Sequence, residues 1–153
     1  MEVTAKKMRR YLMFKLPSAY LCGVKLKEID NSKAVVKVKH KWINQNPFNS
    51  MYFAVQSMAA ELTTGAIVIK KITESGKKIS MLVTNHNGTF TKKATGLITF
   101  TCNDGSLIDE ALKRTIETGE GQTIVMKSYG INEKGEQVSA YEFEWSVRLK
   151  SKK

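Results

Sequence analysis

A chain of 153 residues with 42% hydrophobic and 25% charged side chains can bury one core without disulfides or metal ions, and it is too apolar to be disordered. No apolar run reaches the roughly 20 residues that span a bilayer, and the N-terminal stretch is too short and too charged for a signal peptide. The net charge of +11 is spread along the chain and forms no aromatic-rich basic patch. We therefore expect a single cytoplasmic domain over residues 1–153, without nucleic acid as a partner.

Periodicity and turn residues divide the chain into three helices and six strands. The last strand is the clearest, because Tyr141, Phe143 and Trp145 alternate with polar residues. This alternation predicts an antiparallel sheet with one buried and one wet face. In chain order, the expected elements are a helix at 3–15, strands at 24–29 and 34–42, a helix from about 50 to 75, strands at 79–83 (extendable to 90) and 97–102, a helix at 106–118, and strands at 122–131 and 141–149.

The long helix expected from about residue 50 differs from an ordinary surface helix. Asn49 or Ser50 can supply the capping oxygen, and apolar residues then follow nearly all round the helix. A helix that is apolar on all sides belongs inside the protein. Between Ser50 and Ile69 the only formal charge is on Glu61. Because a lone charge in apolar surroundings is costly unless it is paired or useful, Glu61 is the main candidate functional residue.

The sequence contains no pattern for cysteine, metal or phosphate-loop chemistry. Cys22 and Cys102 are isolated, which favours buried free thiols over a disulfide or a nucleophile. His40 and His86 lack the spacing of metal ligands. Neither a glycine-rich phosphate loop nor a G-x-S-x-G motif is present. We therefore expect no metal site and no cofactor.

Several short motifs together resemble the hotdog-fold thioesterase superfamily. They are Leu16-Pro17, Gly23-Val24, Asn46, Ser50, the run from Ala59 to Gly65, and Lys92-Lys-Ala-Thr-Gly96. The resemblance covers most of the chain and is nearest to an uncharacterised branch, a domain of unknown function, related to PaaI-type acyl-CoA thioesterases. It implies an α+β hotdog fold, in which an antiparallel six-stranded sheet wraps around the long central helix. It also implies a homodimer or dimer of dimers with sites at the subunit boundary, and acyl-CoA or another acyl thioester as substrate.

The resemblance also assigns roles to particular residues. PaaI-type enzymes have an Asn, then His-Gly-Gly at the helix start, then an acid nine positions after the His. Glu61 lies nine positions after Tyr52, so that motif falls on Tyr52-Phe53-Ala54 and the preceding Asn falls on Asn46. By this resemblance Glu61 is the nucleophile or general base, the Phe53 amide polarises the thioester carbonyl, and Asn46 positions Glu61 or the water. The residues expected to contact the substrate are Ser50, Tyr52, Ala54 and Thr64.

The sequence departs from the motif at the start of the helix. No glycine allows close backbone approach at Phe53 or Ala54, and a tyrosine at position 52, with an ordinary pKa of about 10, can donate a hydrogen bond but is a poor base. The alternative hypothesis is a hotdog protein that binds a fatty acyl or other apolar ligand without cleaving it. Each candidate also has a competing structural interpretation. These are a dimer-interface position or a hydrogen bond to Thr64 or Tyr52 for Glu61, a turn for Asn46, a helix cap for Ser50, and packing against the neighbouring sheet for Tyr52.

Overall fold

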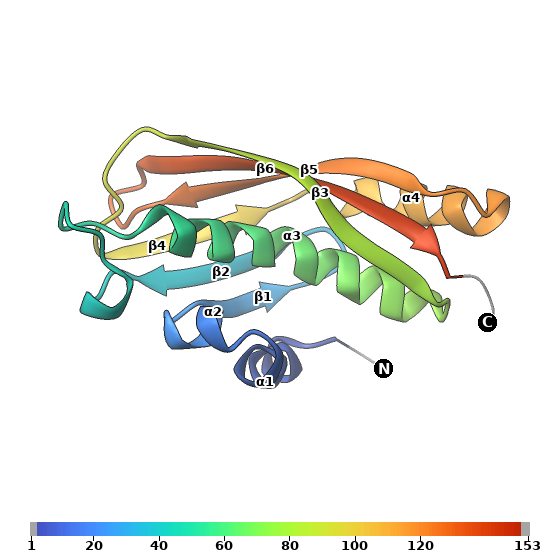
Figure 1. Cartoon of the computed structure of the whole chain (residues 1–153), viewed down its shortest axis with the longest axis horizontal. Helices are drawn as coiled ribbons and strands as arrows, with labels where there is room; N and C mark the ends of the chain where they lie inside the picture. The colour runs from blue at the N-terminus through green and yellow to red at the C-terminus, as the bar shows by residue number, and fades with distance from the viewer. Residues whose placement is uncertain (1–2, 151–153) are drawn as a thin grey trace.

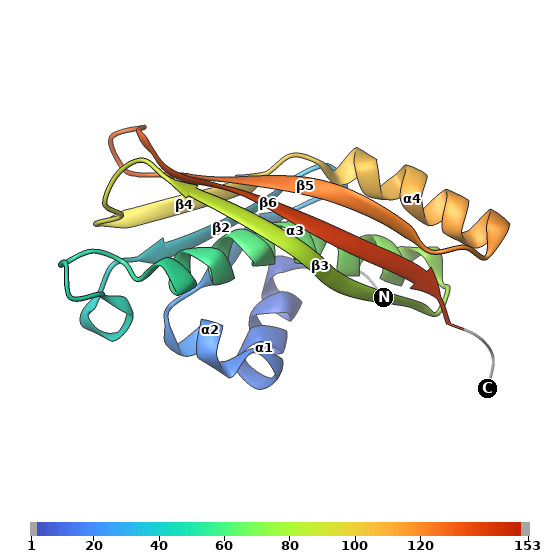
Figure 2. The same ribbon diagram turned by 45° about the horizontal axis from the view of Figure 1, so that its top comes forward.

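The computed structural model describes residues 3–150, in which six strands form one antiparallel sheet in the order β1-β2-β4-β5-β6-β3 (Figure 1). Its elements are α1 (Ala5–Lys15), α2 (Pro17–Leu21), β1 (Lys25–Ile29), β2 (Ala34–Lys39), the 3-10 turn η1 (Trp42–Asn44), α3 (Phe53–Ser75), β3 (Ile79–Phe90), β4 (Leu97–Cys102), α4 (Gly105–Thr118), β5 (Gln122–Ile131) and β6 (Gln137–Leu149). Helices α1 and α2 lie beside β1 in Figure 1. The sheet curves around α3, and α4 lies at one end of the sheet (Figure 2). This is the α+β hotdog arrangement.

The burial of α3 follows from its composition. All seven residues from Leu62 to Val68 are buried, so no side of the helix faces water over two turns. The strands cover one side of α3, and α2 and α4 also contact it. The helix ends at Gly76, which has φ 65 in the left-handed region that favours glycine. The prediction of a buried central helix is confirmed, with burial on all sides limited to this middle stretch.

Strand β6 packs over α3, and two of its aromatic side chains, Tyr141 and Trp145, contact the helix. Tyr141, Phe143, Trp145 and Val147 are each at most 4% exposed, which confirms the predicted alternation. Gly88 on β3 pairs with Tyr141, and a Cβ there would lie 2.8 Å from the tyrosine ring. Glycine therefore lets the Tyr141 ring lie across β3. The Tyr141 hydroxyl donates to the carbonyl oxygen of Phe53 at 3.4 Å, which links β6 to the start of α3.

Two predicted boundaries near the site are wrong. The second strand ends at Lys39 rather than Trp42, because the Asn44 side chain donates to the carbonyl oxygens of Cys22 and Lys39 and turns the chain away from the sheet. Helix α3 begins at Phe53, with Tyr52 as an N-cap that makes no side-chain capping bond. Neither Asn49 nor Ser50 is the cap, so the sequence placed the helix start too early.

Helix α2 is absent from the sequence prediction, which treated Pro17 only as the end of the preceding helix. Pro17 is instead the first residue of a short second helix, a position where its missing N–H costs no hydrogen bond.

None of the helices within residues 3–150 has the length and apolarity needed to cross a membrane.

Candidate functional site

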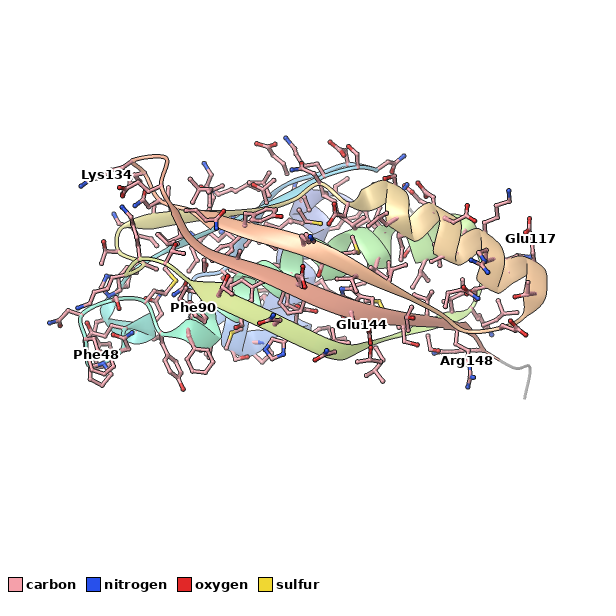
Figure 3. The ribbon with its side chains drawn as sticks, turned by 90° about the horizontal axis from the view of Figure 1, so that it is seen from above. Phe48, Phe90, Glu117, Lys134, Glu144 and Arg148 are labelled. Carbon is pink, nitrogen blue, oxygen red and sulfur yellow. The ribbon has the colours of Figure 1, made fainter. Side chains whose placement is uncertain are left out.

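A cavity of about 620 Å³ opens at the N-terminal end of α3. This volume is typical of small-ligand sites. The loop before α3, the first turn of α3 and the segment that follows β3 form its walls, and Figure 3 shows Phe48 and Phe90 at this end of the molecule. The lining residues are Asn46, Pro47, Phe48, Ser50, Met51, Tyr52, Phe53, Gln56, Phe90, Thr91, Lys92, Lys93 and Ala94.

The loop before α3 is organised by the Asn46 side chain. Its Oδ1 accepts from the backbone N–H groups of Phe48 at 2.9 Å and Ser50 at 3.2 Å. Its Nδ2 donates to Ser50 Oγ at 3.0 Å. Both ends of the amide are therefore engaged inside the loop, and Ser50 is only 5% exposed. These contacts give Asn46 and Ser50 a role in shaping one wall of the cavity.

The first turn of α3 has two unpaired donors, one of them on Phe53, which lines the cavity. Within residues 3–150, the backbone N–H groups of Phe53 and Ala54 have no hydrogen-bond partner. Free N–H groups and the helix dipole together favour negative charge at a helix start. Tyr52 and Phe53 are 47% and 53% exposed, and their rings pack edge to face at 5.0 Å. Ala54 is half-buried and does not line the cavity.

Gln56 is a site residue that the sequence prediction missed. It lines the cavity, is 4% exposed, and donates from Nε2 to the Met51 carbonyl oxygen at 3.4 Å. Its Oε1 has no hydrogen-bond partner in the described part of the chain. An unpaired buried acceptor costs about 1–3 kcal/mol, so the site favours a ligand that donates a hydrogen bond there. A polar residue on an otherwise apolar helical stripe was the available signal.

Glu61 lies apart from this cavity, eight residues or about 12 Å further along the helix axis from Phe53. Its Oε1 is 3.0 Å from the position that a Cβ on Gly65 would occupy, and the edge of the Trp145 indole is 3.1 Å from the same position. No described residue donates a hydrogen bond to the carboxylate. Burial raises the pKa of Glu61 from 4.5 to about 7. The carboxyl group is therefore close to half-protonated at neutral pH.

Thr64 fixes the surroundings of Glu61 without touching its carboxylate. Its hydroxyl donates to the Glu61 carbonyl oxygen at 2.9 Å and accepts from Trp145 Nε1 at 2.9 Å. The threonine is fully buried, and these two bonds hold the indole against α3. The geometry gives Thr64 a positioning role toward Trp145.

The predicted site residues thus fall into two groups on the two parts of α3. The cavity brings together Asn46, Ser50, Tyr52 and Phe53, whereas Glu61 and Thr64 lie under β6. Both cysteines are free, and burial raises the pKa of the Cys102 thiol to about 12, which makes it unreactive. Within residues 3–150 no group of three or more His, Cys, Asp or Glu side chains could hold a metal ion.

Comparisons with known proteins identify a family and the fold. The sequence pattern of a family described as "Domain of unknown function (DUF4442)" matches residues 4–147. No curated protein matches the chain in sequence. Similar solved structures include a protein of unknown function from Pseudomonas aeruginosa described as a probable thioesterase (18% identity, TM-score 0.83, 98% of this chain and 99% of that chain). A protein of unknown function from Chlorobaculum tepidum (15%, 0.83, 95% and 94%) and a thioesterase from Haemophilus influenzae (12%, 0.73, 97% and 93%) are also similar. At these identities the similarity shows the fold.

Proposed function

We propose that this chain, which belongs to the DUF4442 family and has the hotdog fold, hydrolyses acyl thioesters. The observation that supports this proposal is the presence on α3 of two unpaired amides and of a carboxyl group with a pKa of about 7. Unpaired amides can stabilise the oxyanion of acyl transfer, and a carboxyl group with this pKa can both accept and return a proton at neutral pH.

The proposed reaction begins with the thioester carbonyl oxygen at the N–H groups of Phe53 and Ala54. Glu61 accepts a proton from a water molecule, whose oxygen forms a bond to the carbonyl carbon. Negative charge develops on the carbonyl oxygen, where the amides and the α3 dipole stabilise it. The tetrahedral intermediate collapses with cleavage of the C–S bond, and the leaving thiolate takes the proton from Glu61. The products are a carboxylic acid and a thiol.

The distance along α3 requires a second copy of the chain for this chemistry. Phe53 and Glu61 of one chain lie about 12 Å apart along the axis, too far for both to contact one carbonyl group. Strand β3 is an edge strand with 12 residues, and Leu82 on it is 65% exposed. Antiparallel pairing of β3 with its copy would lay the two α3 helices side by side in opposite directions. The amides of one chain would then face Glu61 of the other in a homodimer or dimer of dimers.

The cavity lining favours an acyl-CoA as the thioester. Phe48, Phe53 and Phe90 supply an apolar wall for the acyl chain. Lys92 and Lys93 also line the cavity and carry positive charge suited to the phosphates of coenzyme A. The cytoplasmic location expected from the sequence is part of this proposal.

Hydrolysis of short, medium and aromatic acyl-CoAs, followed by thiol release, tests the proposal. We expect the wild type to turn over at least one substrate and Glu61→Gln to lose at least about a hundredfold in kcat/KM. Glu110→Gln is the matched control, because Glu110 is an exposed glutamate on α4, and it should retain wild-type activity. Absence of turnover by the wild type, or equal rates for wild type and Glu61→Gln, would contradict the proposal.

A second candidate function is binding of an acyl or other apolar ligand without cleavage. The specific observation in its favour is that the aromatic-lined cavity does not include Glu61. Native mass spectrometry of the purified protein separates the two functions. An acyl ligand retained intact, together with no thiol release from any acyl-CoA, would favour binding, whereas turnover that depends on Glu61 would favour hydrolysis.

A further inference from the structure

Five lysines from residues 25–41 gather on one face of the folded protein. Successive side chains of β1 and β2 point to opposite faces of the sheet. Leu26, Val36 and Val38 are buried on the face toward α3, and the lysines next to them in sequence point to the outer face. A shallow hollow of about 360 Å³ lies on that face. Its lining residues are Lys25, Lys27, Lys37, Lys39, Lys41, Gly23 and Leu97. We call this surface the lysine face.

The charges of the lysine face are not neutralised within the described part of the chain. None of the lysines of this face takes part in an ion pair within residues 3–150. The lysines that do are Lys33, Lys70, Lys71, Lys92 and Lys127. Lys25 lies directly opposite Lys37 in the β1–β2 pairing, an arrangement of like charges that destabilises a sheet. Lys37 and Lys39 on β2, and Lys41 just beyond it, continue the face in one direction. These features indicate an extended anionic partner.

Large exposed apolar side chains border the lysine face at one end. Leu21 is 64% exposed, Trp42 is 83% exposed and Ile43 is 52% exposed. The Asn44 side chain donates to the carbonyl oxygens of Cys22 and Lys39, which holds the end of α2 beside the turn after β2. Figure 1 shows α2 and this turn at the end where β2 finishes and β1 begins. The apolar residues therefore form a fixed rim of the lysine face.

We propose that the lysine face and its apolar rim bind an anionic lipid surface. The lysines would contact headgroup phosphates, while Trp42, Ile43 and Leu21 would enter the interfacial region, where tryptophan and aliphatic side chains are favoured. Five lysines carry more positive charge than a single phosphate group can neutralise, which favours a surface that presents many phosphates. Single-stranded nucleic acid would be expected to stack on several aromatic side chains among the lysines, but the hollow is lined by no aromatic residue and its rim supplies one, Trp42.

Binding to vesicles of defined composition tests this inference. We expect the protein to co-sediment with 70:30 phosphatidylcholine:phosphatidylglycerol vesicles at low salt and to dissociate from them at high salt. It should not co-sediment with vesicles of pure phosphatidylcholine. Each lysine should contribute about fivefold, so Lys25→Gln/Lys37→Gln/Lys39→Gln should weaken binding about a hundredfold. Because Trp145 is already buried at 4% exposure, a blue shift of tryptophan fluorescence on binding should come from Trp42 and disappear in Trp42→Phe.

A variant with the same net charge separates this site from general electrostatics. Lys113→Gln/Lys127→Gln/Lys134→Gln removes three exposed lysines elsewhere and should bind the anionic vesicles within a few fold of wild type. The lysine-face variant should unfold at no lower temperature than this control, since it relieves like-charge repulsion. Three results would overturn the inference: no binding to anionic vesicles, equal losses in both triple variants, or affinity for a single-stranded oligonucleotide that the lysine-face variant loses while vesicles remain unbound.

Discussion

The first turn of α3 and its middle provide complementary parts of one reaction. At Phe53 the helix presents unpaired amides to a cavity, among aromatic rings that are about half exposed. At Glu61 the same helix presents a carboxyl group in packed surroundings, beside Gly65 and Trp145. The first turn can stabilise negative charge but has no base, whereas the middle has a base but does not line the cavity. One chain therefore carries both parts and yet does not bring them together.

The largest expected effect comes from removing the amide at the first turn. Phe53→Pro deletes the N–H but suits the backbone, because proline is tolerated at the first helical position and Tyr52, at φ -60 and ψ 135, has the extended conformation that a residue before proline prefers. We expect kcat for acyl-CoA hydrolysis to fall about 100- to 1000-fold. Phe53→Ala is the matched control, since it removes the ring and keeps the amide. Equal activity of the two variants would exclude a catalytic amide.

Mixed dimers test whether the two parts of α3 meet across a subunit boundary. If Glu61 and the Phe53 amide come from different chains, a dimer of one Phe53→Pro and one Glu61→Gln subunit contains one intact site. An equimolar mixture, refolded or exchanged together, should then recover about a quarter of wild-type activity from two nearly inactive parents. If each site lies within one chain, the mixture stays as inactive as its parents. Native mass spectrometry of the mixture confirms that mixed dimers have formed.

The packed surroundings of Glu61 predict a pH-dependent stability. The pKa of Glu61 rises from 4.5 to about 7 on folding, so between these pH values the folded protein keeps a proton that the unfolded chain has lost. Stability therefore falls as pH rises through this range and is level above it. Glu61→Gln removes this loss, and its free energy of unfolding relative to wild type should increase by about 2–3 kcal/mol between pH 5 and pH 8.

Urea denaturation of both proteins at a series of pH values measures this difference. Glu110→Gln should show no such pH dependence, because Glu110 is exposed. If wild type and Glu61→Gln run parallel from pH 5 to pH 8, the carboxyl group is solvated in the protein. The middle of α3 would then be open to solvent at Glu61, as the first turn is at Phe53. The same titration should appear in catalysis, where kcat/KM is expected to rise with pH around a midpoint near 7 as Glu61 becomes a base.

The sequence predicted the packed part of the molecule better than the open part. The burial of α3 and the alternation of Tyr141, Phe143 and Trp145 follow directly from periodicity, because each apolar side chain must be covered by its own neighbours. The start of α3 was misplaced because Ser50 has the side chain of a helix cap but uses it within the loop, in hydrogen bonds with Asn46. The preference of serine for the cap position is a local effect, and here the hydrogen bonds between Ser50 and Asn46 replace the capping bond.

Tertiary contacts explain what the sequence could not show. Gln56 becomes a cavity residue only because the segment after β3 folds over the first turn of α3. The lysine face depends on register: Lys25 and Lys37 lie on consecutive strands and face each other only because β1 and β2 pair in this register. The sequence places the two strands side by side in order but does not set their register, and a shift of one residue would move the lysines to the other face.

The smallest expected effect tests the contact between Gly65 and Glu61. A methyl group at position 65 would lie 3.0 Å from Glu61 Oε1 and 3.1 Å from the Trp145 ring, which its bond to Thr64 holds in place. The crowding costs about 1–3 kcal/mol, and the better helix propensity of alanine offsets about 1 kcal/mol of it. Gly65→Ala should therefore lower the free energy of unfolding by about 1 kcal/mol. In a Glu61→Ala background the crowding at the carboxylate is absent, so the same substitution should cost less. Additive effects in this double-mutant cycle would place the carboxylate away from Gly65, because groups in contact couple and distant groups do not.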